Sequence, residues 1–392
     1  MVKRSLATLL ILLSAPFSRA EETGPDLSKV PPHLIQRCTS ENRLAQIQKF
    51  GGDPKSEKAV IDALRFLKNT QNEDGSWVTG QKVGMTGLAL LTFLGHGETA
   101  QSEEFGETVL TAMYYLVDIS QKNNGKLAAD FKGDHWCYEH AIAVYALAEA
   151  YLLCVKSFGE NIEGLKDAVQ TAGQFMINSQ HKDGGWDYAY SKDSVRGGDV
   201  SITTWHMLAL KALKDTGLDF KNLEKSSRLG LDYIERMQLP SGAIGYLEPQ
   251  LISGQDGTTL AAAGGLCFQI WKSSSTKVAR KACTFIDREM KFAWDTADSD
   301  LYGHFFASRA MFQSGGEAWN RHQAKVFSEI LQNQAPNGSF LPVATKADGK
   351  INAVAPAFLG DKPFATHYRT CLAALILEVY YRHPQVSTAN NR

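Results

Sequence analysis

Four histidines stand near the start of segments rich in small and apolar residues, where imidazole groups could bind a ligand or move a proton. Each histidine alone is more often a hydrogen-bonded core residue, but four of them at one end of a helical ring would form a shared site. Carboxylate and hydroxyl groups stand beside two of them. The candidate ligand-binding residues are therefore Glu139, His140, Thr203, His206, His304 and His367.

A second group of residues has the types that catalysis on a glycan or an alkene would need. Enzymes that cleave glycosidic bonds use a pair of carboxylates, and a Tyr–His pair could serve a lyase. The compact candidates here are Asp298, Asp300, Tyr302 and His304. The simpler interpretation of Asp298 and Asp300 is a solvated cap at the start of the next helix.

A short motif repeated along the chain indicates which elements position these residues. The pattern is Gln-x-x-Asp-Gly-x-aromatic, in which Asp-Gly or Asn-Gly stops a helix and the aromatic side chain folds back over the turn. Weaker copies occupy 121–127 and 238–244. The clear copies are Gln71, Gly75 and Trp77; Gln180, Gly184 and Trp186; and Gln334, Gly338 and Phe340.

The repeat predicts a fold of helical hairpins. Before each glutamine lies an amphipathic helix, and after each turn a helix that is apolar nearly all round, as expected for an outer and an inner ring. Residues 283–290 fill a gap in the spacing as a degenerate copy. The prediction is an all-α (α/α)6 toroid of six helical hairpins over residues 53–385.

The motif resembles the QW-type repeats of the squalene-cyclase and prenyltransferase superfamily, and the resemblance implies the same α/α toroid. No enzymatic branch is matched. The Asp-x-Asp-Asp acid of the cyclases is absent, because Asp298-Ser-Asp300-Leu lacks the second adjacent Asp. The zinc pattern of the prenyltransferases is broken, because Asp134 and Cys137 are one residue too far apart, although His367 fits. We therefore expect no bound metal and no cofactor.

The balance of charges bears on possible partners, and the N-terminal residues bear on the location of the protein. The 41 Lys and Arg residues nearly balance 42 Asp and Glu, which gives no reason to expect a nucleic-acid partner. Residues 1–20 have the charged start, apolar run and small residues of a signal peptide cleaved after Ala20. We expect a secreted or periplasmic protein with a leader at 21–52, a tail at 386–392 and no other membrane-spanning stretch.

Several functions stay open at this stage. The leading hypothesis is a ligand or partner bound at the central mouth, where the inner helices begin; the ligand could be an acidic or amphiphilic small molecule, a glycan or a protein. Helix N-termini attract anions, so we expect an acidic ligand to bind more tightly as pH falls through about 6.5, the ordinary pKa of histidine. Alternatives are a divergent terpene cyclase or prenyltransferase, a polysaccharide lyase or hydrolase, and a scaffold without a ligand.

Overall fold

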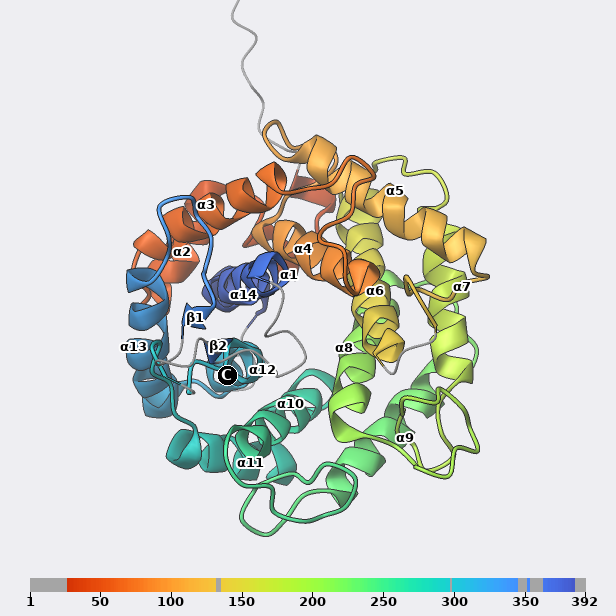
Figure 1. Ribbon diagram of the computed structural model, residues 1–392, viewed down its shortest axis with the longest axis vertical. Helices are drawn as coiled ribbons and strands as arrows, with labels where there is room; N and C mark the ends of the chain where they lie inside the picture. The colour runs from red at the N-terminus through yellow and green to blue at the C-terminus, as the bar shows by residue number, and fades with distance from the viewer. Residues whose placement is uncertain (1–26, 132–134, 297, 345–350, 353–361, 385–392) are drawn as a thin grey trace, which may run out of the picture.

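Twelve long helices form two concentric rings in the computed structural model, which describes residues 27–131, 135–296, 298–344, 351–352 and 362–384 (Figure 1). The outer helices are α3 (Lys55–Asn69), α5 (Gly106–Lys122), α7 (Leu165–Asn178), α9 (Leu223–Arg236), α11 (Lys277–Glu289) and α13 (Gly316–Gln332). The inner helices are α4 (Lys82–His96), α6 (Trp136–Ala150), α8 (Val200–Thr216), α10 (Gln255–Trp271), α12 (Leu301–Ser314) and α14 (Lys362–Leu377). The predicted six-hairpin toroid is confirmed.

The inner ring is closed. Each inner helix packs against the next, and the last, α14, packs against the first, α4. An inner helix therefore has neighbours on both flanks and an outer helix behind it, which explains why α4 is buried along nearly its whole length. Outer helices such as α9 and α11 are amphipathic, because one face meets solvent.

The intact motif turns pack against the next outer helix. Gly75 and Gly184 have positive φ angles of 84° and 101°, a conformation that glycine adopts at low cost. A Cβ at either glycine would lie 2.3 Å from a backbone oxygen of the following outer helix. The Gln71 amide donates to Gly75 O and to Thr108 O on that helix, both at 3.0 Å. Glycine and glutamine therefore fix one seam of the outer ring.

The seam that closes the ring has the same chemistry. Gln334 donates to Gly338 O at 3.0 Å and to Ala59 O of α3 at 2.7 Å. A Cβ at Gly338 would lie 2.1 Å from Asp62 O, also on α3. The sixth hairpin is therefore held to the first hairpin by the same glutamine hydrogen bonds that hold the first hairpin to the second.

The motif tryptophans cover the ends of their own outer helices, as the sequence predicts. The indole N–H of Trp77 donates to Leu67 O at 2.8 Å, and that of Trp186 donates to Met176 O at 2.9 Å. Both rings are fully buried. The fifth turn lacks the motif: Met290 follows α11 with an extended backbone, and the Phe292 side chain packs inward instead.

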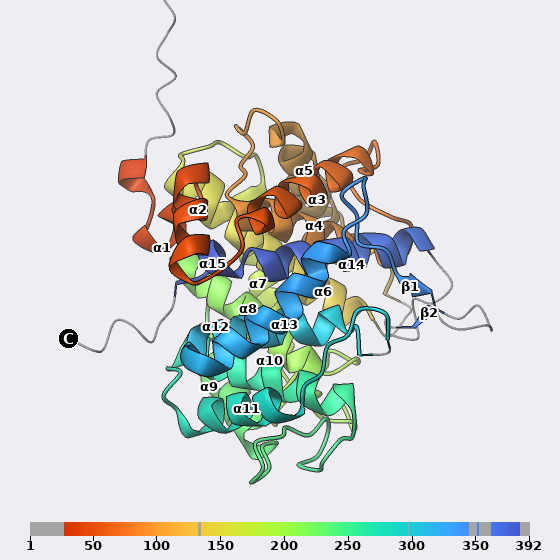
Figure 2. The same ribbon diagram turned by 90° about the vertical axis from the view of Figure 1, so that its left-hand side faces the viewer.

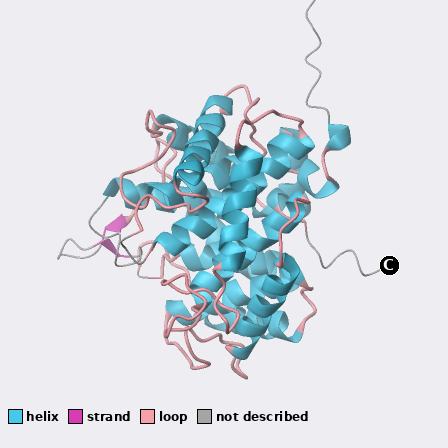
Figure 3. Ribbon diagram, turned by 90° about the vertical axis from the view of Figure 1, so that its right-hand side faces the viewer, coloured by secondary structure: helices cyan, strands magenta, loops and turns pink. Residues whose placement is uncertain are grey.

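The two ends of the toroid differ in what covers them (Figures 2 and 3). One end, which we call the base, carries α1 (Pro32–Ile35), α2 (Ser40–Lys49) and α15 (Val379–Arg382), with α2 packed on α15 and α3. The other end carries loops and the antiparallel pair β1 (Val343–Ala344) and β2 (Ile351–Asn352). The base also includes the short η1 (Leu27–Lys29).

The range expected as a leader therefore contributes helices to the domain, because its apolar side chains, such as Leu34 and Ile47, are buried. The predicted signal peptide and tail lie outside the described residues.

The expectation that no other stretch is long and apolar enough to span a membrane needs correction. Helix α6 continues as the π-helical η2 (Tyr151–Ser157), and Trp136–Ser157 is long and apolar enough to span a bilayer. It is an inner-ring helix, and 89% of its most apolar window is buried.

Candidate functional site

The four histidines predicted to line the mouth are buried within the wall of the toroid instead. Three of them donate to backbone oxygens: His206 to Ile202 O at 2.8 Å, His304 to Lys291 O at 3.1 Å and His367 to Met85 O at 3.1 Å. His140 Nδ1 accepts the Leu127 N–H at 3.0 Å. The expectation of an open histidine site is wrong, because these side chains hold turns and neighbouring helices together.

Burial also keeps these histidines neutral. It lowers the pKa of His140 and of His206 to about 3, and the pKa of His304 and of His367 to about 4. The ring of His206 stacks on Trp186 with centroids 4.9 Å apart. None of the four therefore gains a proton near pH 6.5. They give no reason to expect that anions bind more tightly as pH falls through 6.5.

The N-termini of alternate inner helices are already occupied by carboxylates of the chain. Glu139 accepts the N–H groups of Val83 and Gly84 at the start of α4, at 3.0 and 3.1 Å. Asp199 caps α8, and Asp300 caps α12. These carboxylates neutralise the partial positive charge of the helix ends. Three of the six inner-helix N-termini are thus occupied, which weakens the predicted preference of the mouth for anions.

A further candidate, Thr203, also has a structural role. Thr203 is buried, and its hydroxyl accepts the N–H of Trp186 at 3.0 Å. Thr86 plays the same part for the Trp77 N–H, at 3.3 Å. Thr203 therefore fixes a motif turn against its inner helix and is not exposed for a ligand.

Glu139 is the group beside the mouth that we expect to titrate near neutral pH. Burial raises its pKa to about 7, against the opposing effect of backbone N–H donors at Gly84 and Val83. Carbon-13 NMR of labelled glutamate, with Glu139→Gln used for assignment, should therefore show a carboxyl midpoint near 7. A midpoint at or below the ordinary value of 4.5 would show that the helix N-terminus outweighs burial.

The predicted catalytic candidates do not converge. The carboxylate of Asp300 accepts the Tyr302 N–H at 3.0 Å and the Thr259 hydroxyl at 3.1 Å, so its oxygens act as a cap. Burial raises the pKa of Asp300. Asp298 is half-buried in the preceding turn. Tyr302 and His304 are two residues apart on α12 and therefore point to different sides of the helix. The structure brings together neither a carboxylate pair nor a Tyr–His pair at these positions.

Tyrosines, instead, gather where the inner helices begin. We call Tyr138, Tyr188, Tyr246, Tyr302 and Tyr368 the tyrosine cluster; each is half-buried. The rings of Tyr138 and Tyr188 are 6.0 Å apart, and the hydroxyls of Tyr188 and Tyr246 are 3.4 Å apart. Burial, and then the neighbouring Tyr302, raises the pKa of Tyr138 and likewise that of Tyr368. Tyr138 and Tyr368 are therefore neutral phenols, which both donate and accept hydrogen bonds.

A loop arginine holds part of the cluster in place. The guanidinium of Arg196 lies over the Tyr188 ring at 4.6 Å and over the Tyr246 ring at 5.7 Å. It also pairs with Asp199 at 2.9 Å, so its charge is balanced. Sequence reasoning missed Arg196, Tyr188 and Tyr246, because they lie in loops outside the repeat. A usable signal for Tyr188 was the concentration of aromatic residues at 186–190; Tyr246 has no such signal.

Below the tyrosine cluster, side chains meet across the axis of the inner ring. Trp205 of α8 stacks on Phe305 of α12 with centroids 5.5 Å apart, although α10 lies between these helices in the ring. One level further down, Arg309 of α12 contacts Tyr145 of α6. Contacts between helices that are not neighbours in the ring fill the axis at these two levels. The described residues therefore do not form a deep apolar funnel at these two levels.

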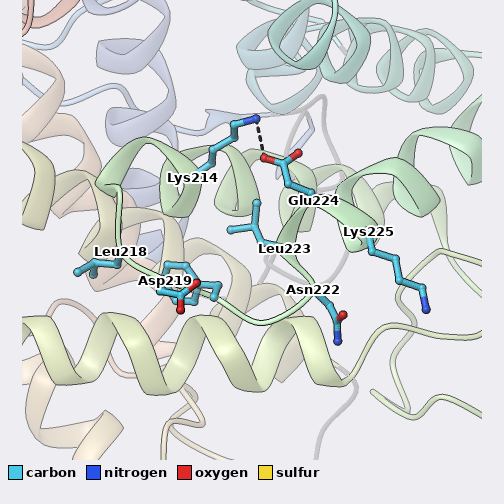
Figure 4. A pocket seen from close by; sticks show the side chains of 8 residues that line it. Lys214, Leu218, Asp219, Asn222, Leu223, Glu224 and Lys225 are labelled. Carbon is cyan, nitrogen blue, oxygen red and sulfur yellow. Dashed lines mark ion pairs between the residues drawn. The ribbon is translucent and has the colours of Figure 1, made fainter.

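A shallow hollow lies on the outside, where α8 is joined to α9 (Figure 4). Its side chains are mostly charged or polar, and Lys214 pairs with Glu224 across it at 2.7 Å. It adjoins the C-terminal end of α8, whereas the tyrosine cluster adjoins the N-terminal ends of the inner helices. We assign it no function.

No protein-family model matches this chain, and no curated protein does. Solved structures are similar to it. A protein from Actinoplanes shares 17% identity over 83% of this chain and 99% of its own, with a TM-score of 0.54. A variant of the type II terpene cyclase MstE from Scytonema, with geranylgeranyl dihydroxybenzoate bound, shares 13% over 89% and 100%, with a TM-score of 0.54. An inactive variant of the alpha-1,6-mannanase GH76A of Salegentibacter sp. HEL1_6, bound to alpha-1,6-mannotetrose, shares 10% over 83% and 98%, with a TM-score of 0.53.

The chain has the α/α-toroid fold. The resemblance inferred from the motif is thereby confirmed at the level of fold. A terpene cyclase and a mannanase are about equally similar to this toroid, and a fold alone does not determine chemistry. Function must therefore be argued from the residues at the mouth.

Proposed function

We propose that the toroid binds a glycan at its mouth, through the tyrosine cluster, and does so as an exported protein. The observation that carries this proposal is the group of half-buried tyrosines at the mouth, in which burial raises the pKa values of Tyr138 and Tyr368 and keeps their hydroxyls protonated. A sugar presents C–H faces, which pack on aromatic rings, and hydroxyls, which pair with neutral donors and acceptors. Similar toroids include one with a bound mannotetrose, which gives this ligand class a precedent on the fold.

Binding without hydrolysis fits the carboxylates better than catalysis does. Asp199 is paired with Arg196, and Asp300 is held by backbone and hydroxyl donors, so each already has its partners. A glycosidase needs one carboxyl as acid and a second as base or nucleophile, both facing the sugar. Terpene cyclisation, the alternative, would need room on the axis, where Trp205 meets Phe305.

Replacing Tyr188 by alanine should weaken glycan binding at least tenfold, because it removes a stacking surface and the ring on which Arg196 rests. The measurement is isothermal titration calorimetry with manno-oligosaccharides, followed by other neutral oligosaccharides. Tyr114→Ala is the matched control, because Tyr114 is 42% exposed on the outer helix α5 and should have no effect.

Two results would contradict the proposal. One is equal oligosaccharide affinity in Tyr188→Ala and the parent. The other is binding of an isoprenoid amphiphile in place of any glycan, which would favour the cyclase-like alternative. Export is tested separately, because N-terminal sequencing of protein from the extracytoplasmic fraction should begin at Glu21. Mature protein that retains residues 1–20 in the cytoplasm would exclude it.

A further inference from the structure

The base of the inner ring contains a group of buried charges far from the tyrosine cluster. The carboxylate of Glu149, on α6, pairs with Arg37 at 3.3 Å and with Arg382 at 3.4 Å. Burial alone would raise the pKa of Glu149, but Arg382 and Arg37 outweigh it and hold that pKa below its ordinary value. Glu149 is therefore an anion shared between two arginines.

A third arginine in this group has no carboxylate partner. Arg309, on α12, is only 9% exposed, and among the described residues no carboxylate oxygen lies within 4.0 Å of its guanidinium. It donates to a neutral phenol, the hydroxyl of Tyr145, at 3.4 Å, and the charge of Glu149 acts on it only from a greater distance. Its Nε has no hydrogen-bond partner, and neither has the Nε of Arg37 or of Arg382.

The remaining charges nearby do not balance Arg309. Burial raises the pKa of Glu378 well above its ordinary value and so favours its neutral form. Even an ionised Glu378 would leave three arginines against two carboxylates. Arg43 is matched by Glu57 at 2.7 Å. Burial alone would raise the pKa of Glu98, but its contact with His96 lowers that pKa, and Glu98 pairs with this histidine at 2.7 Å and not with Arg309. Burial lowers the pKa of His33 and of His383.

We propose that the base of the ring binds a small oxyanion, phosphate or sulfate in type, between Arg309, Arg382 and Tyr145. A buried cation is strongly destabilising unless an anion is paired with it. Guanidinium groups present several N–H donors in a plane and suit tetrahedral oxyanions. The guanidinium of Arg382 lies 5.9 Å from the Tyr145 ring, so both arginines face the same tyrosine.

This site is independent of the glycan proposed at the mouth. Along α12, Tyr302, Phe305 and Arg309 follow one another at spacings that place them on one face. The stack of Phe305 on Trp205 therefore separates the base site from the tyrosine cluster. Failure of the glycan experiment would leave the anion experiment unaffected, and the reverse is also true.

The test is thermal unfolding of the full chain in 0–20 mM inorganic phosphate, with chloride at matched ionic strength, supported by equilibrium dialysis with radioactive phosphate. We expect phosphate to raise the melting temperature of the parent and to bind at about one per chain. Arg309→Gln should weaken phosphate binding at least tenfold. Arg321→Gln, at an exposed arginine paired with Asp287, is the matched control and should bind as the parent does.

A second measurement separates a ligand site from a purely structural arginine. In anion-free buffer, Arg309→Gln should unfold at the same temperature as the parent or a higher one, because it removes an unpaired buried charge. A melting temperature lowered in anion-free buffer, or an equal response to phosphate in parent and variant, would overturn the proposal. The same titration is repeated with sulfate, acetate and glycerol phosphate. Binding of inorganic phosphate alone indicates that the site takes a free ion. Tighter binding of glycerol phosphate indicates that it takes the charged end of a larger ligand.

Discussion

Replacing Trp186 by alanine should lower the free energy of unfolding by about 3–5 kcal/mol, the usual cost of deleting a large buried aromatic side chain. The ring is 0% exposed and stacks on His206, and its N–H satisfies Met176 O at the end of α7. Urea unfolding followed by circular dichroism would measure the change. Trp186→Phe is the matched variant, because it keeps an aromatic ring, as Phe340 does in the sixth turn, and loses the N–H donor and part of the ring volume.

The ordering of these variants is the decisive result. Trp186→Phe should fall between the parent and Trp186→Ala, with a loss of about 1–2 kcal/mol from the missing indole hydrogen bond and the reduced packing. A Trp186→Ala protein that melts within a degree or two of the parent would show that the turn does not depend on this ring.

Replacing Glu149 by glutamine should cost about 3–5 kcal/mol at pH 7, because Arg37 and Arg382 would lose their shared anion while staying buried. Arg382 and Arg37 hold the pKa of Glu149 below its ordinary value of 4.5. Its stabilising contribution is therefore present above pH 4.5 and is lost as pH falls through the lower pKa of the folded state. Denaturant unfolding of parent and variant from pH 7 to pH 3 should show the difference shrinking toward acid.

Glu104→Gln is the control for that experiment. Glu104 also pairs with an arginine, Arg65, but both side chains are largely exposed, and exposed pairs contribute less than about 1 kcal/mol. Equal losses in the two variants, or a Glu149→Gln difference that grows toward acid, would contradict the assignment of Glu149 as a buried anion.

Local sequence was sufficient to predict the turns and hence the fold. Gln180 bonds within the turn and to the next outer helix, and Trp186 bonds to the end of its own outer helix. These contacts follow from local spacing, so the spacing carries the information. The degenerate fifth copy at 283–290 kept its place in the ring without the glycine. There Phe292 packs on His304 with centroids 4.7 Å apart, much as Trp186 packs on His206.

The site could not be predicted in the same way, because inner helices are apolar on all sides. Without a polar face, the pattern does not show which side of such a helix meets the axis. Trp205 and His206 are adjacent in sequence, yet Trp205 crosses the axis to Phe305 while His206 lies behind it against Trp186. Charged residues inside apolar segments, Glu149 and Arg309, were the available signal for the base site, but their partners lie far away in the sequence.

The seam between the last and first hairpins has a consequence for how the protein is made. Gln334 and Ala59 are 275 residues apart, so during synthesis the first hairpin emerges long before the helix that covers it. Until α13 and α14 have been translated, the Ala59 carbonyl of α3 lacks the Gln334 amide and the apolar flank of α4 lacks its neighbour. Exposed apolar surface of this kind makes a nascent chain prone to aggregation. A chain truncated before residue 316 would expose the unfinished edge permanently, so complete translation is a condition for a soluble ring.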